Sequence, residues 1–177
     1  MVITKEQLIY CGVPKYKASV FSYLISKFSD KYNINTRMRM AHFLSQVLHE
    51  SCCFIYLQEL ASGEQYEGRK DLGNTSKGDG KRYKGRGVLQ ITGKVNYMRV
   101  SKALGVDFVS NPYLLEQPEY AVTSAMWWWN EHKLNELADK DELTKITKII
   151  NGGYNGKESR LKYLGKAKRA LGLLKIN

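Results

Sequence analysis

The stretch NTRMRMAHFLSQVLHESCCFIYLQE, residues Asn35–Glu59, has the spacing of a long amphipathic helix that carries a carboxylate on its apolar face. Its apolar side chains recur at alternating intervals of three and four residues, which is one side of an α-helix. They are Met40, Phe43, Val47, Phe54 and Leu57. Glu50 completes that series, and further apolar residues widen the stripe on both sides of it. We therefore expect this helix to be the centre of the fold.

Glu50 has two interpretations at this level. A carboxyl group without a partner in apolar surroundings is costly to ionise, so it tends to keep its proton, and this suits a general acid working near neutral pH. The other interpretation is a structural ion pair between a buried Glu50 and one of the 28 lysines and arginines. The helix alone does not separate them.

The composition limits the class of protein. A chain of 177 residues with three prolines and no low-complexity linker is expected to form one domain, residues 1–177, and we expect a monomer. The formal charge of +11 indicates an anionic partner, which could be nucleic acid, a membrane surface or a bacterial wall. No RNP-type or helix-turn-helix signature is present, so we expect no nucleic-acid partner.

The cysteines and the first residues bear on where the protein is made. Three cysteines, two of them adjacent, form neither a disulfide framework nor a CxxC site, and are expected to be reduced core thiols of a cytosolic product. The N-terminus has Glu6 early and no long apolar segment of a secretory signal. Apolar runs reach only about six residues, far short of the roughly 20 that span a membrane.

Several further elements follow from local patterns. Helices are expected at residues 4–11, 15–32, 93–104, 117–132, 143–150 and 160–177. In the second of these, Val20, Leu24 and Phe28 are expected to face inward. Residues 61–87 are rich in glycine and predict a long functional loop, and Val88–Thr92 predicts a short strand. A strand beside such a loop and under a long helix is typical of a cleft.

Two of these helices carry unusual side chains. The run Trp127–Trp129 faces several directions, so core packing is favoured over sugar stacking, although one ring is free to face a site. The last helix has six lysines and arginines and no acid. It is expected to dock on its own domain, and a second interpretation adds contact with anionic membrane or lipopolysaccharide.

The sequence contains no recognised motif for binding a metal ion or a nucleotide. His49-Glu50 opens like HExxH but the fifth residue is Cys53, and the P-loop, GxGxxG and GxSxG patterns are also missing. We therefore expect no metal and no cofactor. Paired carboxylates remain, and a glycosidase needs one as acid and one as base or nucleophile.

Glu50 is the candidate acid, and five residues supply candidate partners. These are Glu59, Glu64, Glu67, Asp71 and Asp79. In an unbroken helix Glu59 would lie about 180° round and some 13 Å along the axis from Glu50. Glu59 can therefore serve only if the helix ends or bends near residues 56–58 and the chain folds back. The alternative is a solvated glutamate near a helix end.

Four blocks of sequence resemble a known family. They are FLSQVLHES (residues 43–51), YKGRGVLQITG (83–93) with Asn96-Tyr97, Asn111-Pro112, and IINGG (149–153). In this order they resemble glycoside hydrolase family 19, the chitinase-like family. The stretch YEGRKDLGN, residues 66–74, resembles its bacteriophage endolysin branch.

The resemblance implies a mainly α, lysozyme-like α+β fold with a small β element beside a cleft. It also implies hydrolysis of β-1,4 bonds between N-acetylated sugars with inversion. The catalytic roles fall on Glu50 as general acid, Glu59 as second carboxylate and Thr92 as a hydroxyl that helps hold the water. The substrate-binding roles fall on Tyr83, Arg86, Gln90, Asn96 and Asn151. An arginine that plant members carry after the NGG block has only Arg160 as a loose counterpart.

The sequence therefore predicts an endolysin that cleaves peptidoglycan glycan strands. We expect it to act on the wall after release from the cytoplasm of a bacterial host. A chitinase acting on N-acetylglucosamine polymers is the alternative, and a non-catalytic wall-binding protein is a third hypothesis.

Overall fold

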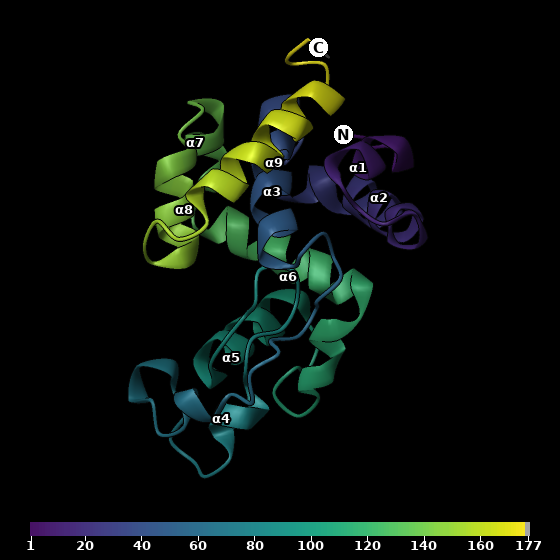
Figure 1. The fold of residues 1–177 in the computed structure, drawn as a ribbon. Helices are drawn as coiled ribbons and strands as arrows, with labels where there is room; N and C mark the ends of the chain where they lie inside the picture. Colours follow the sequence, from purple (N-terminus) through teal and green to yellow (C-terminus); the bar gives the residue numbers. More distant parts are fainter. Residues whose placement is uncertain (176–177) are drawn as a thin grey trace.

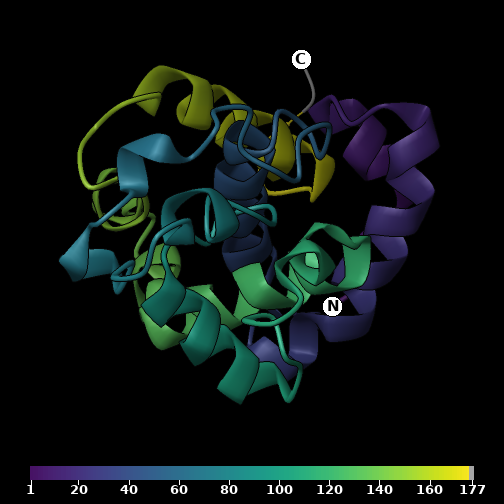
Figure 2. The ribbon, with the colours of Figure 1, turned by 90° about the horizontal axis from the view of Figure 1, so that it is seen from below.

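The computed structural model describes residues 1–175 and shows two lobes joined through helix α6 (Figures 1 and 2). The large lobe holds α1 (Lys5–Cys11), α2 (Lys15–Ser29), α3 (Arg37–Glu50), α7 (Leu134–Asp139), α8 (Leu143–Asn151) and α9 (Lys157–Ala170). The small lobe holds α4 (Asp79–Arg82) and α5 (Lys94–Leu104), and α6 is Pro118–Glu131. Short 3-10 turns are η1 (Asp30–Tyr32), η2 (Glu64–Tyr66), η3 (Lys70–Leu72) and η4 (Pro112–Glu116). The expected mainly helical fold is confirmed.

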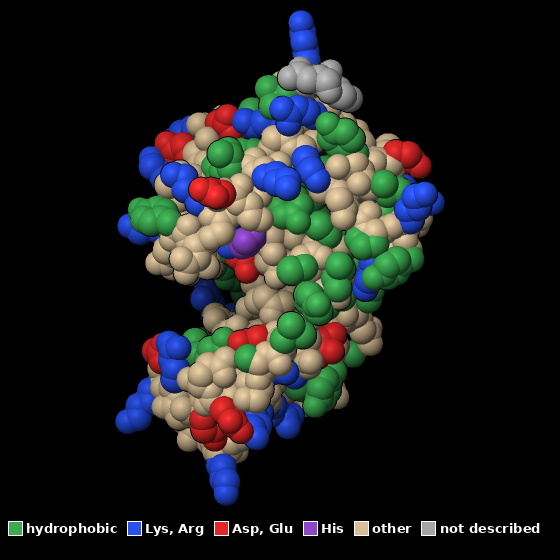
Figure 3. Space-filling model, in the orientation of Figure 1, with side chains coloured by type: hydrophobic (Ala, Val, Ile, Leu, Met, Phe, Trp, Pro, Cys, Tyr) green, Lys and Arg blue, Asp and Glu red, His purple; other side chains and the backbone are tan. Residues whose placement is uncertain are grey.

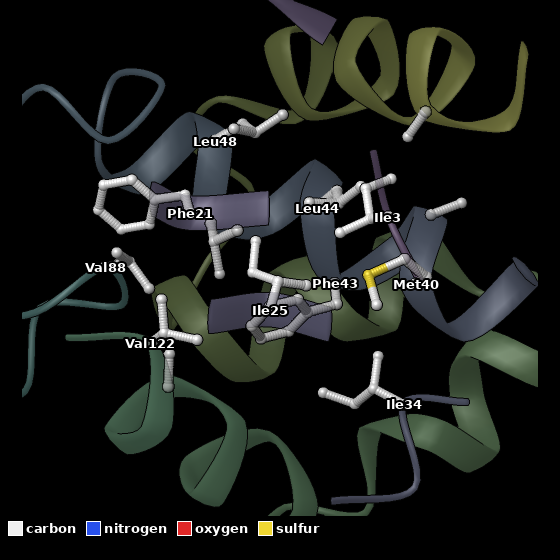
Figure 4. Packing of buried hydrophobic residues seen from close by; sticks show 14 of the residues in the cluster. Ile3, Phe21, Ile25, Ile34, Met40, Phe43, Leu44, Leu48, Val88 and Val122 are labelled. Carbon is white, nitrogen blue, oxygen red and sulfur yellow. The ribbon is translucent and has the colours of Figure 1, made fainter. Parts of the chain in front are cut away.

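Helix α3 is the centre of the large lobe, as its apolar spacing predicts. Figure 2 shows it, in dark blue, passing through the middle of the other helices. The Thr36 side chain caps its first turn by accepting from the Arg39 N–H at 3.2 Å. Every residue from Met40 to Leu48 is buried. Figure 4 shows Phe43 and Leu44 among apolar side chains from several other segments, including Val122 of α6.

The first two helices follow their predicted bounds closely. Thr4 and Gln7 form a capping box at the start of α1, with hydrogen bonds of 3.2 and 2.8 Å. In α2 the predicted inward face is correct at Leu24, which is buried, and at Phe28, which packs against the core, but wrong at Val20, which is 46% exposed while Phe21 is fully buried. The 3-10 turn η1 completes the predicted span to Tyr32.

The prediction that the central helix continues toward Glu59 is wrong, since α3 ends at Glu50. The Ser51 hydroxyl donates to the Val47 carbonyl at 2.6 Å and accepts from the Phe54 N–H at 2.9 Å. The three residues Cys52, Cys53 and Phe54 then adopt left-handed φ angles of 47°, 59° and 66°. The turn sends the Phe54 ring into the core, where it stacks on Phe21 at 4.1 Å. The chain after Glu50 therefore reverses.

The small lobe contains less β structure than predicted. Val88–Thr92 is not a strand, because Gln90 has a φ of 55° and the segment is a turn. Within the described residues the β element reduces to two isolated bridges, Gln58 with Arg86 and Arg86 with Ile91. A second core fills this lobe, built from Tyr83, Ile91, Tyr97, Val100, Phe108 and Leu115. Trp127 and Trp128 of α6 pack against both cores.

The C-terminal helix docks on the large lobe, as expected. Helix α9 packs along α3, with Leu164 and Ala167 of its inner face buried. The predicted helix extended to Asn177, but α9 ends at Ala170, and residues 176–177 lie outside the described part of the chain. In residues 1–175 no helix combines the length and the apolar character that a membrane crossing requires.

Candidate active site

The surface is hollowed between the two lobes (Figure 3). A pocket of about 310 Å³ here, which we call the two-acid pocket, contains both carboxylates of the predicted catalytic pair. Its lining residues are Glu50, Tyr56, Gln58, Glu59, Leu60, Ala61 and Gln90. Because α3 ends at Glu50 and the chain then reverses, Glu59 returns to the same pocket as Glu50. The sequence set the condition that the helix end or bend near residues 56–58 and that the chain fold back; the helix ends earlier than that, at Glu50, and the chain does fold back.

Glu50 is not the unpaired carboxyl that the sequence suggests. Its Oε1 accepts a hydrogen bond from Nη2 of Arg160, which lies in α9 and is fully buried. The Glu50 side chain keeps 20% exposure, and its Oε2 forms no hydrogen bond with residues 1–175. The ion-pair interpretation is therefore correct, and the paired Glu50 also lines the two-acid pocket. The loose counterpart Arg160 is the partner.

Arg160 is held by several groups besides Glu50. Its Nη1 donates to Oε1 of Gln46 at 2.5 Å, and its backbone carbonyl accepts from the Ser45 hydroxyl at 2.8 Å. Gln46 is fully buried, and its Nε2 has no partner among the described residues. A buried guanidinium fixed in this way orients the Glu50 carboxyl group.

His49 precedes Glu50 and packs against the start of α9. Its Nδ1 lies 2.9 Å from the Ser159 hydroxyl. An added Cβ at Gly156 would lie 2.3 Å from the His49 ring, so only glycine fits there. Burial, and next the nearby Arg160 charge, lower the pKa of His49, while Glu50 raises it. The ring is therefore neutral near neutral pH.

Glu59 is anchored by neutral donors. Its Oε1 accepts from Tyr66 Oη and Gln65 Nε2, both at 2.9 Å, and its Oε2 accepts from the Gly85 N–H at 3.1 Å. Burial, and after it the bond to Glu59, raise the pKa of Tyr66, which keeps this phenol a donor. An added Cβ at Gly85 would lie 3.3 Å from the Glu59 Oε2 and 2.8 Å from the Gln90 Oε1. Glycine therefore permits the close approach.

The other candidate acids are engaged elsewhere. Glu64 pairs with Lys81, Asp71 with Arg69 and Asp79 with Lys94, while Glu67 accepts from the N–H groups of Gly78 and Gly80. None of these four acids lines the two-acid pocket. Glu59 alone among the five predicted partners shares a pocket with Glu50.

A second pocket of about 260 Å³, the Thr92 pocket, adjoins the first through Gln90, which lines both. Its lining residues are Leu72, Leu89, Gln90, Ile91, Thr92, Asn96, Trp128 and Ile150. The Thr92 hydroxyl donates to the Gln90 carbonyl at 2.9 Å, and Asn96 Nδ2 donates to the Thr92 carbonyl at 2.7 Å. Thr92, Gln90 and Asn96 are therefore brought together, and Trp128 supplies an indole beside them.

Three predicted substrate contacts lie elsewhere. Tyr83 and Arg86 are 3% and 2% exposed and line neither pocket, so direct sugar contact is not supported by their placement. Arg86 instead pairs with Glu116 at 2.7 Å and donates to the Tyr97 hydroxyl at 2.9 Å, which ties the small lobe together. Asn151 is exposed at the end of α8, next to Ile150 of the Thr92 pocket, and does not line it.

Four groups of this site were not predicted as functional. Gln46 and Tyr66 hold other site residues and lie inside the recognised blocks, but neither type of residue suggests chemistry by itself. Trp128 was one of three equivalent indoles in the sequence, and Arg160 lies 110 residues from Glu50. Over residues 1–175, no cluster of three or more His, Cys, Asp or Glu side chains could hold a metal ion.

Comparison with known proteins points to one family. The profile of glycoside hydrolase family 19, described as class I chitinase, matches residues 25–145. A glycosyl hydrolase family 19 domain-containing protein of Haemophilus influenzae is 32% identical over 169 residues, covering 78% of this chain and 82% of the relative. An Arabidopsis thaliana endochitinase is 34% identical over 145 residues, covering 77% of this chain. The alignment spans only 49% of that plant relative.

Solved structures share the fold. Chitinase C of Streptomyces griseus superposes with a TM-score of 0.74 at 21% identity, covering 96% of this chain and 92% of that one. A class IV chitinase of Zea mays gives a TM-score of 0.68 at 22% identity, covering 86% and 80%. At such identities the likeness concerns the fold, and it agrees with the mainly helical architecture.

Proposed function

Because this chain belongs to glycoside hydrolase family 19, the class I chitinase family, we propose that it hydrolyses β-1,4 glycosidic bonds of bacterial peptidoglycan as a lysozyme-type endolysin. The observation that carries the proposal is the placement of Glu50 and Glu59 in one pocket, each fixed by its own set of hydrogen bonds. A general acid and a general base that face one space are what an inverting glycosidase needs.

Glu50 is the general acid of this mechanism. Its Oε1 is occupied by Arg160, so the carboxyl group is oriented with Oε2 available to carry the proton. Protonating the leaving oxygen from Oε2 leaves a carboxylate whose charge the Arg160 guanidinium stabilises.

Glu59 is the general base. Its three hydrogen bonds come from neutral donors, so the carboxylate is positioned without being neutralised by a cation. It would take a proton from the water that attacks the anomeric carbon from the face opposite the leaving group. The Thr92 hydroxyl donates its hydrogen bond to the Gln90 carbonyl, so its lone pairs can accept a hydrogen bond from a water.

The surface charge supports peptidoglycan as the polymer. Peptidoglycan carries carboxylates on its peptide substituents, whereas chitin is neutral, and the chain has a formal charge of +11. Long-range attraction of this kind raises encounter rates with an anionic polymer. The endolysin role would place synthesis in the cytoplasm of a bacterial host and action on the wall after release. Chitin is the second candidate substrate, because curated relatives are named endochitinases.

Mass spectrometry of the products from purified peptidoglycan tests the proposal. We expect soluble glycan fragments with a new reducing end, and the identity of that sugar shows which bond is cut. Glu50→Gln should stay folded and release none. A folded and fully active Glu50→Gln protein would contradict the assignment. Turnover of chitin oligomers but not of peptidoglycan would make chitin the substrate.

A further inference from the structure

The groove continues beyond the two-acid pocket into a third pocket of about 310 Å³, the Lys17 pocket. Its lining residues are Lys17, Ile55, Tyr56, Leu57, Gln58, Leu60 and Glu116. Three of them, Tyr56, Gln58 and Leu60, also line the two-acid pocket. The two-acid pocket therefore adjoins the Lys17 pocket through these three residues and the Thr92 pocket through Gln90.

Lys17 is the only cationic side chain among the residues that line these three pockets. It forms no salt bridge within residues 1–175. The one acid in its pocket is Glu116, whose Oε1 already accepts from Arg86 Nε at 2.7 Å and Gln58 Nε2 at 2.8 Å. Lys17 therefore has no carboxylate partner among the described residues; its Nζ lies 5.9 Å from the centre of the neighbouring Tyr16 ring, and its side chain lines the groove.

The surroundings of Lys17 are apolar and open. Ile55, Tyr56 and Leu60 are 45%, 43% and 78% exposed, although each is a large hydrophobic side chain. Exposed apolar side chains gathered beside a substrate groove are typical of a binding surface. A ligand that suits this place combines a carboxylate for Lys17 with apolar faces or methyl groups for its neighbours.

We propose that Lys17 binds a carboxylate on the lactyl-peptide substituent of a peptidoglycan strand and thereby favours this polymer over chitin. Every second sugar of peptidoglycan carries such a substituent, which has methyl groups and acidic groups, whereas chitin offers only neutral N-acetyl groups. The inference rests on the proposed function, because it assumes that a glycan occupies the two-acid pocket. Lys17 is a specificity-determining residue in this scheme and takes no part in bond cleavage.

Binding to catalytically disabled protein tests this directly. In a Glu50→Gln background, calorimetry would compare soluble disaccharide-peptide oligomers with neutral N-acetylglucosamine oligomers of equal length. Lys17→Met keeps the length and helix propensity of the side chain and removes its charge. At low ionic strength we expect Lys17→Met to weaken binding of the acidic oligomer about fivefold and leave the neutral one unchanged. Lys17→Arg should retain the affinity.

The matched control is Lys15→Met, since Lys15 is an exposed lysine two residues away that lines none of the three pockets. It should leave both affinities unchanged. Equal weakening for both oligomers, no weakening, or no binding of the acidic oligomer by the parent protein would overturn the inference. Lys17-dependent binding of the acidic oligomer, combined with no release of sugar from peptidoglycan by the active enzyme, would instead refute the proposed function and leave the inference standing.

Discussion

Arg160, fully buried in the last helix, donates a hydrogen bond to the Glu50 carboxyl group at the end of the central helix, 110 residues earlier in the chain. The same guanidinium donates to Gln46 one turn before Glu50 on α3. One side chain therefore joins α9 to the two-acid pocket and fixes the direction of the candidate acid.

Replacing Arg160 by methionine should damage both stability and activity. The change leaves Gln46 Oε1 without its donor and Glu50 without its cation, so we expect a loss of about 2–4 kcal/mol in the free energy of unfolding. Arg169→Met, on the same helix and without a hydrogen bond from its side chain within the described residues, should cost less than about 0.5 kcal/mol. Urea unfolding of both variants measures this, and equal losses would refute a special role for Arg160.

Tyr66→Phe should lower activity with little effect on stability. It removes the 2.9 Å bond to Glu59 and leaves the bonds from Gln65 and Gly85. A loosened base should reduce kcat about tenfold with KM nearly unchanged, while stability falls by only about 1 kcal/mol. Tyr10→Phe, at an exposed position on α1, is the control and should match the parent. A change in KM alone would show that Tyr66 acts in binding.

Gly156→Ala should be worse than Gly152→Ala, although the two glycines have similar φ angles of 72° and 76°. Both changes strain a left-handed residue by about 1 kcal/mol. The new Cβ at position 156 would also meet the His49 ring at 2.3 Å, whereas nothing lies within 4 Å at position 152. We expect an additional loss of about 1–3 kcal/mol for Gly156→Ala, with reduced activity because His49 adjoins Glu50. Thermal melts of the pair measure the difference, and equal melting temperatures would show that the ring moves freely.

Stability should fall on mild acidification. Burial lowers the pKa of His42 below its usual 6.5 despite the Asp141 carboxylate at 2.7 Å, and His42 Nδ1 has no partner in residues 1–175. The pKa of His49 is lowered as well. Between the lowered pKa values and 6.5 the unfolded chain binds more protons, so the free energy of unfolding decreases as pH drops through this window.

Melting temperatures measured between about pH 8 and pH 5 test this loss of stability. The curve should be nearly flat above 6.5 and decline below it. His42→Gln should reduce the decline, even if it lowers the melting temperature throughout. Arg39 lowers the pKa of Asp139. At Asp141 burial, the largest single effect, raises the pKa, but Lys168 and His42 together lower it by more, so both carboxylates lose their contribution only near 3.8 and below. An unchanged slope in His42→Gln would exclude His42 as its source.

Local signals predicted the parts of the fold that depend on neighbouring residues. Thr4 with Gln7, and Thr36, mark helix starts through side-chain to backbone bonds within three residues. The C-terminal end of α3 could not be predicted from such local signals. Phe54 and Leu57 continue the apolar spacing of the helix although the chain has turned left-handed, because Phe54 reaches the core against Phe21 by another route.

In the candidate site, too, local sequence patterns pointed to some residues and missed the contacts between distant segments. Glu50 was proposed from helix periodicity and Gln90 from the family resemblance, and Glu59 was proposed on the condition that the helix end or bend near residues 56–58. The helix ends earlier, at Glu50, and these three residues line one pocket. The Glu50–Arg160 pair lies beyond such reasoning, since no periodicity links residues on α3 and α9. Tyr83 and Arg86 are buried, and Arg86 pairs with Glu116, so the block that contains them also builds the scaffold under the groove; their contact with sugar stays a prediction.

The pairing of α3 with α9 also bears on biosynthesis. On a translating ribosome Glu50 leaves the exit tunnel long before Arg160 is made, so the acid lacks its guanidinium until the final helix has emerged and docked. Fragments released before that point would carry both glutamates without the guanidinium that orients Glu50.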